Sequence, residues 1–313
     1  MTRKAVTAYD NPRWKGRRPA LSVLIPFLRD DPSELLQLLD EEAAAVGRSV
    51  EVIVLDDGTG DAALTARLTE QMKRMSLSAR LLTLTKNEGR SVGRNRLAAN
   101  ARGGSLLFLD SDMRPDHRRF LWTWADLVSR EDPAVAFGGF SLLQAPTDPR
   151  FSVHRSLALK SECVPYTDRA RQPEKYVYTA NLLVRRDVFE AEAFDSAFTG
   201  WGWEDVEWAM RVSRRFRVVH IDNPATHMGL DTVDALAAKY EQSAPNFARV
   251  VDRHPDIVSG YPSYKVARLI KRLPGAMMAR PWLKRAARTD WLPPAARAFS
   301  LRLYRAALYA EAV

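Results

Sequence analysis

The stretch that decides the fold is Ser105-Leu-Leu-Phe-Leu-Asp110-Ser-Asp112-Met-Arg-Pro-Asp116. Its apolar part, residues 106–109, is short and continuous, which is typical of a strand buried on both faces of a parallel sheet. Asp110 and Asp112 follow where that strand would end, and ligands bind at the carboxyl ends of strands in open α/β sheets. Because two carboxylates there are costly to desolvate without a cation between them, one interpretation is a hard divalent cation. The other is a polar turn that caps the strand.

The sequence on either side of this stretch alternates between strand-like and helix-like segments. Apolar runs predict strands at residues 21–25, 50–55, 80–84, 135–143, 176–184 and 217–221. Amphipathic patterns predict helices at about 33–45, 61–75, 87–100, 116–129, 200–215 and 232–252. Alternation at this spacing predicts βαβ units, and therefore an α/β fold with a mostly parallel sheet flanked by helices.

The composition is that of a globular protein. The 313 residues are 46% hydrophobic and 27% charged, and one cysteine, Cys163, excludes a disulfide framework. Residues 1–20 form a basic N-terminal arm without the apolar centre of a signal peptide. The longest uncharged stretch, residues 133–147, is 15 residues long and too short to cross a bilayer. We therefore expect a cytoplasmic protein, or one that lies peripherally on the cytoplasmic face of a membrane.

The net charge of +9 is concentrated at the C-terminal end. Residues 261–313 hold eleven Lys and Arg against two acidic residues, so the rest of the chain is close to neutral. This asymmetry predicts a body at 21–230 and a basic helical extension at 231–313. A basic amphipathic helix with tryptophans, here Trp282 and Trp291, can lie on an anionic membrane surface. The alternative is that these helices pack on the body and leave their charges in solvent.

Two further pairs of acids stand where elements are predicted to meet. Asp56 and Asp57 follow the second strand, and Glu204-Asp205 stands at the start of a helix. Acids at a helix N-terminus can be simple capping residues, but a carboxylate there can also serve as a general base. Trp201 and Trp203 precede the second pair and would either contact a ligand or pack in the core.

Taken together and in order, these motifs resemble those of family 2 glycosyltransferases with the GT-A fold. The resemblance covers roughly residues 20–230. Its halves would be a donor half at about 21–112 and an acceptor half at about 113–230. The matching features are Ser22-Val-Leu-Ile25-Pro26, Val54-Leu55-Asp56-Asp57-Gly58, Gly93-Arg94-Asn95, Leu109-Asp110-Ser111-Asp112, Trp203-Glu204-Asp205-Val206-Glu207 and His227.

On the donor side, the resemblance implies a nucleotide sugar, with a UDP-sugar as first choice, and a divalent cation, Mn²⁺ or Mg²⁺. Asp112 and His227 would ligate the cation, and Asp110 would reach the ribose and a metal-bound water. A histidine beside carboxylate ligands favours Mn²⁺, because imidazole is a borderline ligand. The other residues implied to bind the nucleotide sugar are Pro26, Asp56, Asp57, Arg94 and Ser111.

On the acceptor side, the resemblance implies a hydroxyl of a saccharide or a lipid-linked saccharide. Asp205 would take the proton of that hydroxyl, and Glu204 would bind further acceptor hydroxyls. Trp201 and Trp203 would contact the acceptor sugar. A base opposite the leaving group implies single displacement with inversion, in the assembly of a surface polysaccharide or glycolipid.

The sequence departs from the family pattern in two places. Phe27-Leu28-Arg29 replaces the usual residues after Pro26, so the pocket for the base is open to question. The Gln-x-x-Arg-Trp motif of processive synthases is absent, which predicts a non-processive enzyme.

Two other classes of protein could contain some of these features. A sugar nucleotidyltransferase would need a Gly-rich, Lys-bearing loop after the first strand, and Pro26-Phe27-Leu28 offers none. A non-enzymatic nucleotide- or nucleic-acid-binding protein could use the basic tail, but the tail lacks the interleaved aromatic residues that bind single strands. We therefore expect no nucleic-acid partner.

Overall fold

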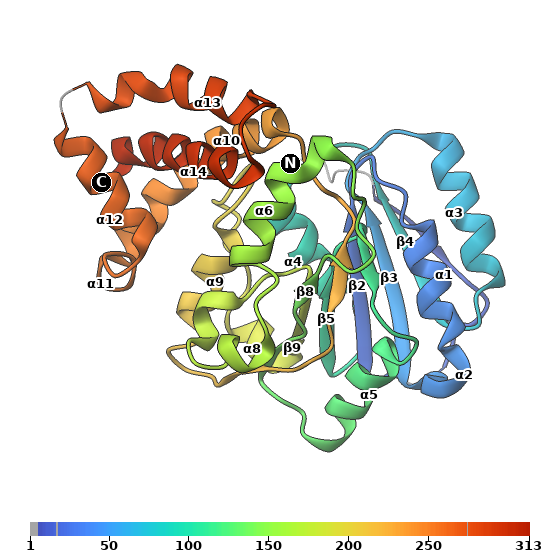
Figure 1. Ribbon diagram of the computed structural model, residues 1–313. Coiled ribbons are helices and arrows are strands. Elements are labelled where there is room, and N and C mark those ends of the chain that lie inside the picture. Colours follow the sequence, from blue (N-terminus) through green and yellow to red (C-terminus); the bar gives the residue numbers. More distant parts are fainter. Residues whose placement is uncertain (1–5, 17, 274) are drawn as a thin grey trace.

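The computed structural model describes residues 6–16, 18–273 and 275–313, so parts of the predicted N-terminal arm lie outside the described residues. The centre of the fold is an eight-stranded sheet in the order β1-β4-β3-β2-β5-β9-β7-β10 (Figure 1). Its strands are β1 (Val6–Asp10), β2 (Leu21–Phe27), β3 (Val50–Asp56), β4 (Ser78–Leu84), β5 (Ser105–Leu109), β7 (Val135–Phe137), β9 (Asn181–Arg185) and β10 (Val218–His220).

The middle of this sheet is parallel, as the sequence predicts. β2 pairs in parallel with both β3 and β5, and Leu24 lies opposite Ile53 and Phe108. All five residues of β5 are buried, which explains its unbroken apolar run. β1 and β9 run antiparallel to their neighbours β4 and β5. β1 was not predicted, because it is a short edge strand with mostly exposed side chains.

The strand predicted at 135–143 is broken at Gly138 and Gly139. β7 ends at Phe137, and β8 (Phe140–Ser141) joins a second, three-stranded sheet with β6 (Met113–Pro115) and β11 (Ala225–His227). Gly139 has a φ of 103°, and a side chain on Gly138 would collide with Asn181. The strand predicted at 176–184 forms only from Asn181, after a short 3₁₀ segment, two irregular residues and one turn.

Helices cover both faces of the main sheet (Figure 1). One face is covered by the helices that share its apolar core, namely α1 (Ser33–Glu41), α2 (Ala43–Val46), α3 (Ala62–Arg74) and α5 (Phe120–Arg130). The other is covered by α4 (Arg90–Asn100), α8 (Arg186–Ala191) and α9 (Glu204–Val212). The main sheet is thereby buried between two helical layers, as an α/β fold requires.

The C-terminal extension folds onto this body. It contains α10 (Val233–Arg253), α11 (Pro255–Val258), α12 (Pro262–Arg272), α13 (Arg280–Arg288) and α14 (Pro294–Tyr309), and it packs beside α6 (Ser152–Ser161) of the body (Figure 1). The short helix α7 (Tyr166–Arg169) lies next to β10. Leu301 of α14 is fully buried in a cluster with Leu157 of α6, and Tyr309 is buried in a second cluster with Met210 of α9. The extension is therefore packed as part of the core. Among the described residues, no helix combines the length and apolarity needed to cross a bilayer.

Candidate active site

The carboxyl ends of two strands that pair in parallel with β2, namely β3 and β5, carry acids that the sequence singles out. β3 ends at Asp56, and Asp110 follows β5, with β2 between them in the sheet. Pro26 lies near the end of β2, opposite Leu55 of β3, and Ser111 lies in the turn between Asp110 and Asp112. The structure therefore gathers these residues at one edge of the sheet.

Asp57 is hydrogen-bonded to the loop that precedes α4. Its carboxylate accepts hydrogen bonds from the backbone N–H of Glu88 at 2.7 Å and of Gly89 at 3.1 Å, and from the Asn87 side chain at 3.0 Å. Burial raises the pKa of Asp57, although these hydrogen bonds oppose the shift. Asp56 accepts one hydrogen bond, from the N–H of Thr59 at 2.8 Å. Asp57 thus positions α4, whose arginines reach the site.

Arg94 joins the end of β5 to the start of α9. It is 1% exposed, and its Nη2 atom donates to Asp110 at 2.7 Å. Its Nη1 atom lies 3.8 Å from Glu204, which is 5% exposed. Arg90, one turn earlier on α4, lies 3.9 Å from the same carboxylate. Two arginines on one helix face therefore hold Asp110 and Glu204 together.

Asp112 and His227 meet although they come from distant parts of the chain. His227 of β11 pairs with Met113 of β6, and its Nε2 atom lies 3.3 Å from Asp112 Oδ2. Burial alone would lower the pKa of His227, but the carboxylate of Asp112 raises it to about 9. Burial would likewise raise the pKa of Asp112, but His227 lowers it. The two side chains form an ion pair.

The metal-binding possibilities extend to two residues that the sequence did not indicate. Ligand atoms of His154, Glu162 and His227 lie within 4.8 Å of one another, which is the one such group of three in the described part of the chain. The Nδ1 atom of His154 accepts the N–H of Asp231 at 2.7 Å, so the proton of a neutral His154 is on Nε2. Its lone pairs are then unavailable to a metal. This leaves Glu162, at the end of α6, as an added oxygen ligand beside His227.

The start of α9 carries the second predicted element. Burial and the charge of Glu204 raise the pKa of Asp205 well above its usual value, to about 7. Trp203 precedes the helix with a φ of 74°, and its indole N–H donates to the Tyr309 hydroxyl at 2.9 Å. The ring of Trp201 lies 6.2 Å from that of Tyr240 on α10. Both tryptophans therefore contact the C-terminal extension.

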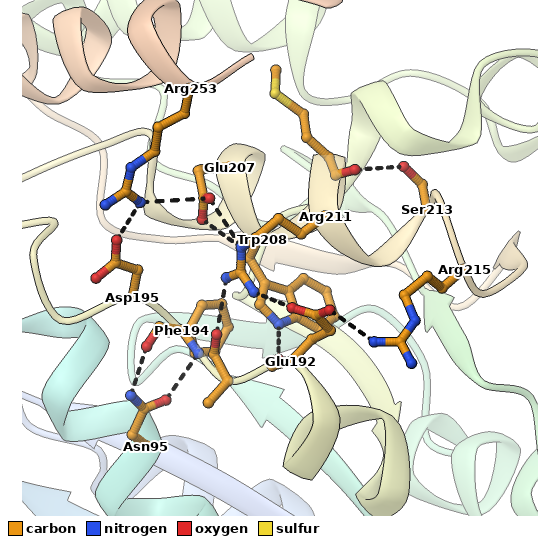
Figure 2. Close-up of polar contacts among 12 residues, drawn as sticks. Asn95, Glu192, Phe194, Asp195, Glu207, Trp208, Arg211, Ser213, Arg215 and Arg253 are labelled. Carbon is orange, nitrogen blue, oxygen red and sulfur yellow. Dashed lines mark hydrogen bonds and ion pairs between the residues drawn. The ribbon is translucent and has the colours of Figure 1, made fainter.

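A network of charged residues around Glu207 and Arg211 holds α9 in place (Figure 2). Glu207 is 1% exposed and accepts from Arg211 at 2.9 Å and 3.1 Å, and Arg211 also donates to Glu192 at 2.5 Å. Arg253 of α10 lies 3.8 Å from Glu207 and also pairs with Asp195. These contacts tie α9 to the loop before it and to α10.

Asp30 is a further acid at the site that sequence reasoning missed. It stands in the loop after β2, where burial and the nearby charge of Asp112 raise its pKa, while Lys239 and Arg90 oppose the shift. The departure of residues 27–29 from the family pattern was the signal that this loop differs.

Comparison with known proteins agrees with the geometry. The model of the family described as glycosyl transferase family 2 matches residues 22–192. A curated dolichyl-phosphate beta-glucosyltransferase of Drosophila melanogaster is 33% identical over 99 residues, which is 29% of this chain and 30% of that protein. The match therefore spans less than a third of the relative's length.

Solved structures share the fold at low sequence identity. The mannosyltransferase PcManGT from Pyrobaculum calidifontis, in complex with GDP-Man and Mn²⁺, has a TM-score of 0.57 and 16% identity, covering 97% of this chain and 89% of that one. TarS 1-349 of S. aureus, in complex with UDP-GlcNAc, has a TM-score of 0.51 and 16% identity, covering 91% and 89% of the two chains.

Proposed function

The chain belongs to glycosyl transferase family 2, and we propose that it is an inverting, metal-dependent and non-processive enzyme. The proposed donor is a nucleotide sugar, with a UDP-sugar as first choice, and the proposed acceptor is a hydroxyl of a saccharide or lipid-linked saccharide. Two structures of the same fold support the donor class, because one was solved with UDP-GlcNAc and the other with GDP-Man.

The observation that carries the proposal is the state of Asp205. A general base works best when its pKa is near the working pH, and burial beside Glu204 raises the pKa of Asp205 to about 7. Arg90 and Arg94 both contact Glu204 at the start of the helix that carries Asp205. The carboxylate of Glu204 therefore keeps a fixed position beside Asp205. These features match a base more closely than a capping residue in solvent.

The proposed reaction is a single displacement. The acceptor oxygen forms a bond to the anomeric carbon, and the bond between that carbon and the diphosphate oxygen breaks with its electron pair. The hydroxyl proton passes to a carboxylate oxygen of Asp205. Attack from the face opposite the leaving group inverts the anomeric configuration.

The residues present fit a divalent cation. One carboxylate oxygen of Asp112 and one nitrogen of His227 converge at 3.3 Å, and the side chains are 30% and 23% exposed, so both can reach a ligand. Asp110, in contrast, already accepts from Arg94 and would act on the ribose or on water. When bound, Mn²⁺ or Mg²⁺ would stabilise the charge that develops on the departing diphosphate.

A panel of UDP-, GDP-, TDP- and CMP-sugars tests this proposal. We expect one donor to raise the melting temperature only when MnCl₂ or MgCl₂ is present, since a ligand at 100 times its Kd stabilises by about 2.7 kcal/mol. Proton NMR of the product would then show the inverted anomeric configuration. The proposal is wrong if no donor stabilises the protein with metal, or if the configuration is retained.

The same proposal includes a peripheral membrane contact on the cytoplasmic face. The tail buries one part of its apolar surface in the core but exposes another, and its eleven basic residues favour an anionic partner. The apolar residues of the tail that are more than half exposed are Leu269 at 58%, Leu273 at 52%, Met278 at 80%, Trp282 at 72%, Trp291 at 83% and Phe299 at 61%. Such a contact would suit a lipid-linked acceptor.

A further inference from the structure

The side chain of Arg305 on α14 is only partly exposed. It nevertheless forms no hydrogen bond or ion pair with any described residue. Its guanidinium carbon lies 5.1 Å from the ring centre of Tyr240 and 6.0 Å from that of Tyr309. Several other basic residues of the tail are paired, such as Arg280 with Glu311 and Arg297 with Asp290. Because a charge withdrawn from water is costly unless it is paired, the lack of an anion beside Arg305 needs an explanation.

Electrostatic effects connect Arg305 to residues around the proposed reaction centre. Both Tyr178 and Glu162 act on it electrostatically. Tyr178 is also influenced by Asp205, and Glu162 by His227. The guanidinium is thus within electrostatic range of the residues that flank the proposed base and the proposed metal pair.

An aromatic row connects Arg305 to the start of α9. The ring of Trp201 lies 6.2 Å from Tyr240, whose ring in turn packs on Arg305. Lys239 lies 5.9 Å from the Trp201 ring, but its ammonium is paired with Asp231 at 2.6 Å. The row therefore presents one uncommitted cation, Arg305, within the part of the chain that the structure describes.

We propose that Arg305 binds an anionic group, a phosphate or a carboxylate, that the acceptor carries beside its reacting sugar. The inference rests on the proposed function, since it assigns a partner to the acceptor side of that site. A guanidinium fork suits both oxyanions because it can donate two parallel hydrogen bonds. The aromatic row to Trp201, the residue proposed to contact the acceptor sugar, favours the acceptor over the donor diphosphate as the source of that anion.

The test compares three sugars that differ in one group. Methyl β-glucoside, its 6-phosphate and methyl β-glucuronide are titrated by ligand-observed NMR into the full chain and into Arg305→Gln and Arg305→Lys. The matched control is Arg285→Gln, which removes from α13 of the same tail an exposed arginine that forms no ion pair with any described residue. Binding of UDP with MnCl₂ is measured on each variant, and melting temperatures report whether each is folded.

We expect an anionic sugar to bind the wild-type chain more tightly than the neutral one, by about tenfold or more for a charge-assisted contact. Arg305→Gln should abolish that preference, Arg305→Lys should keep part of it, and Arg285→Gln should keep all of it. The anion that binds more tightly identifies the group as phosphate or carboxylate.

The inference is overturned if the wild-type chain binds all three sugars equally, or if Arg305→Gln keeps the preference. It is also overturned if Arg305→Gln weakens UDP binding, because Arg305 would then belong to the donor site. Failure of the proposed function looks different. In that case the wild-type chain would not bind UDP with metal, while a preference that depends on Arg305 would still mark an anion site.

Discussion

The Nε2 atom of His227 lies 3.3 Å from the Oδ2 atom of Asp112, and a glycine makes this approach possible. The N–H of Met228 donates to the backbone carbonyl of Asp112 at 2.9 Å, which brings the next residue, Gly229, against the carboxylate. A side chain on Gly229 would overlap Asp112 Oδ2. The geometry of the proposed metal site therefore depends on a residue that offers no ligand.

Gly229→Ala is expected to weaken metal-dependent binding of UDP by about 10- to 100-fold, the range seen when residues that support metal ligands are changed. Isothermal titration with UDP and MnCl₂ measures the effect. Gly104→Ala is the matched control, because an added Cβ there would make only an ordinary contact at 3.8 Å with Ala20. Unchanged binding in Gly229→Ala would show that Asp112 does not ligate the cation.

Asp205→Asn is expected to lower the transfer rate by about 10²- to 10⁴-fold and to leave donor affinity unchanged, because an amide cannot accept the proton. If donor binding is lost instead, Asp205 belongs to the nucleotide site.

The pH dependence of the wild-type enzyme gives a separate check on Asp205. The base acts in its ionised form, and its pKa is raised to about 7. The value of kcat/KM should therefore fall as the pH drops below about 7 and level off above it. The residual activity of Asp205→Asn should lack this acidic limb, and a wild-type limb near pH 4 would contradict the assignment.

The parts of the site that could be predicted from sequence are those fixed by local pattern. The apolar run at 106–109 predicts β5, and its end places Asp110 and Asp112 at the carboxyl edge of the sheet. The start of α9 could likewise be predicted, because acidic side chains are stabilised at a helix N-terminus.

The rest depends on contacts between distant segments that leave no periodic signal. Glu162 reaches His227 from the end of α6, in a region of irregular sequence. By composition, Arg305 is one of the charges of a basic tail that could bind a surface. In the structure, α14 packs Leu301 into the core and places Arg305 beside Tyr240. The sequence is compatible with a tail that binds a surface or packs on the body, and the buried residues of the tail show that much of it packs on the body.

Arg94→Met is expected to destabilise the protein because it leaves Asp110 and Glu204 without their shared partner. Breaking a buried ion pair costs about 3–5 kcal/mol. We expect a loss of stability near the lower end of that range, because Asp110 is 23% exposed. Urea unfolding measures the loss, and Arg67→Met is the control, because its pair with Asp31 is exposed at 59% and 46% and should contribute below about 1 kcal/mol. Equal losses in both variants would refute a structural role for Arg94.

The membrane contact cannot be tested by deleting the tail, because residues 261–313 include Leu301 and Tyr309, which are buried against α6 and α9. Substitution of exposed residues keeps that packing. The double variant Trp282→Ser/Trp291→Ser removes two rings that are 72% and 83% exposed, and Leu143→Ser is the control, because this side chain of the body is 75% exposed.

Sedimentation with vesicles of phosphatidylcholine and phosphatidylglycerol measures the binding at low and high salt. We expect the wild-type chain and Leu143→Ser to sediment with anionic vesicles at low salt, and high salt to release them, because each Lys or Arg near the surface contributes about 1 kcal/mol before screening. The tryptophan double variant should remain largely in the supernatant, since it keeps the charge but loses the interfacial anchors. If the wild-type chain stays in the supernatant at low salt, the exposed apolar residues do not face a membrane, and the acceptor is then better sought among water-soluble saccharides.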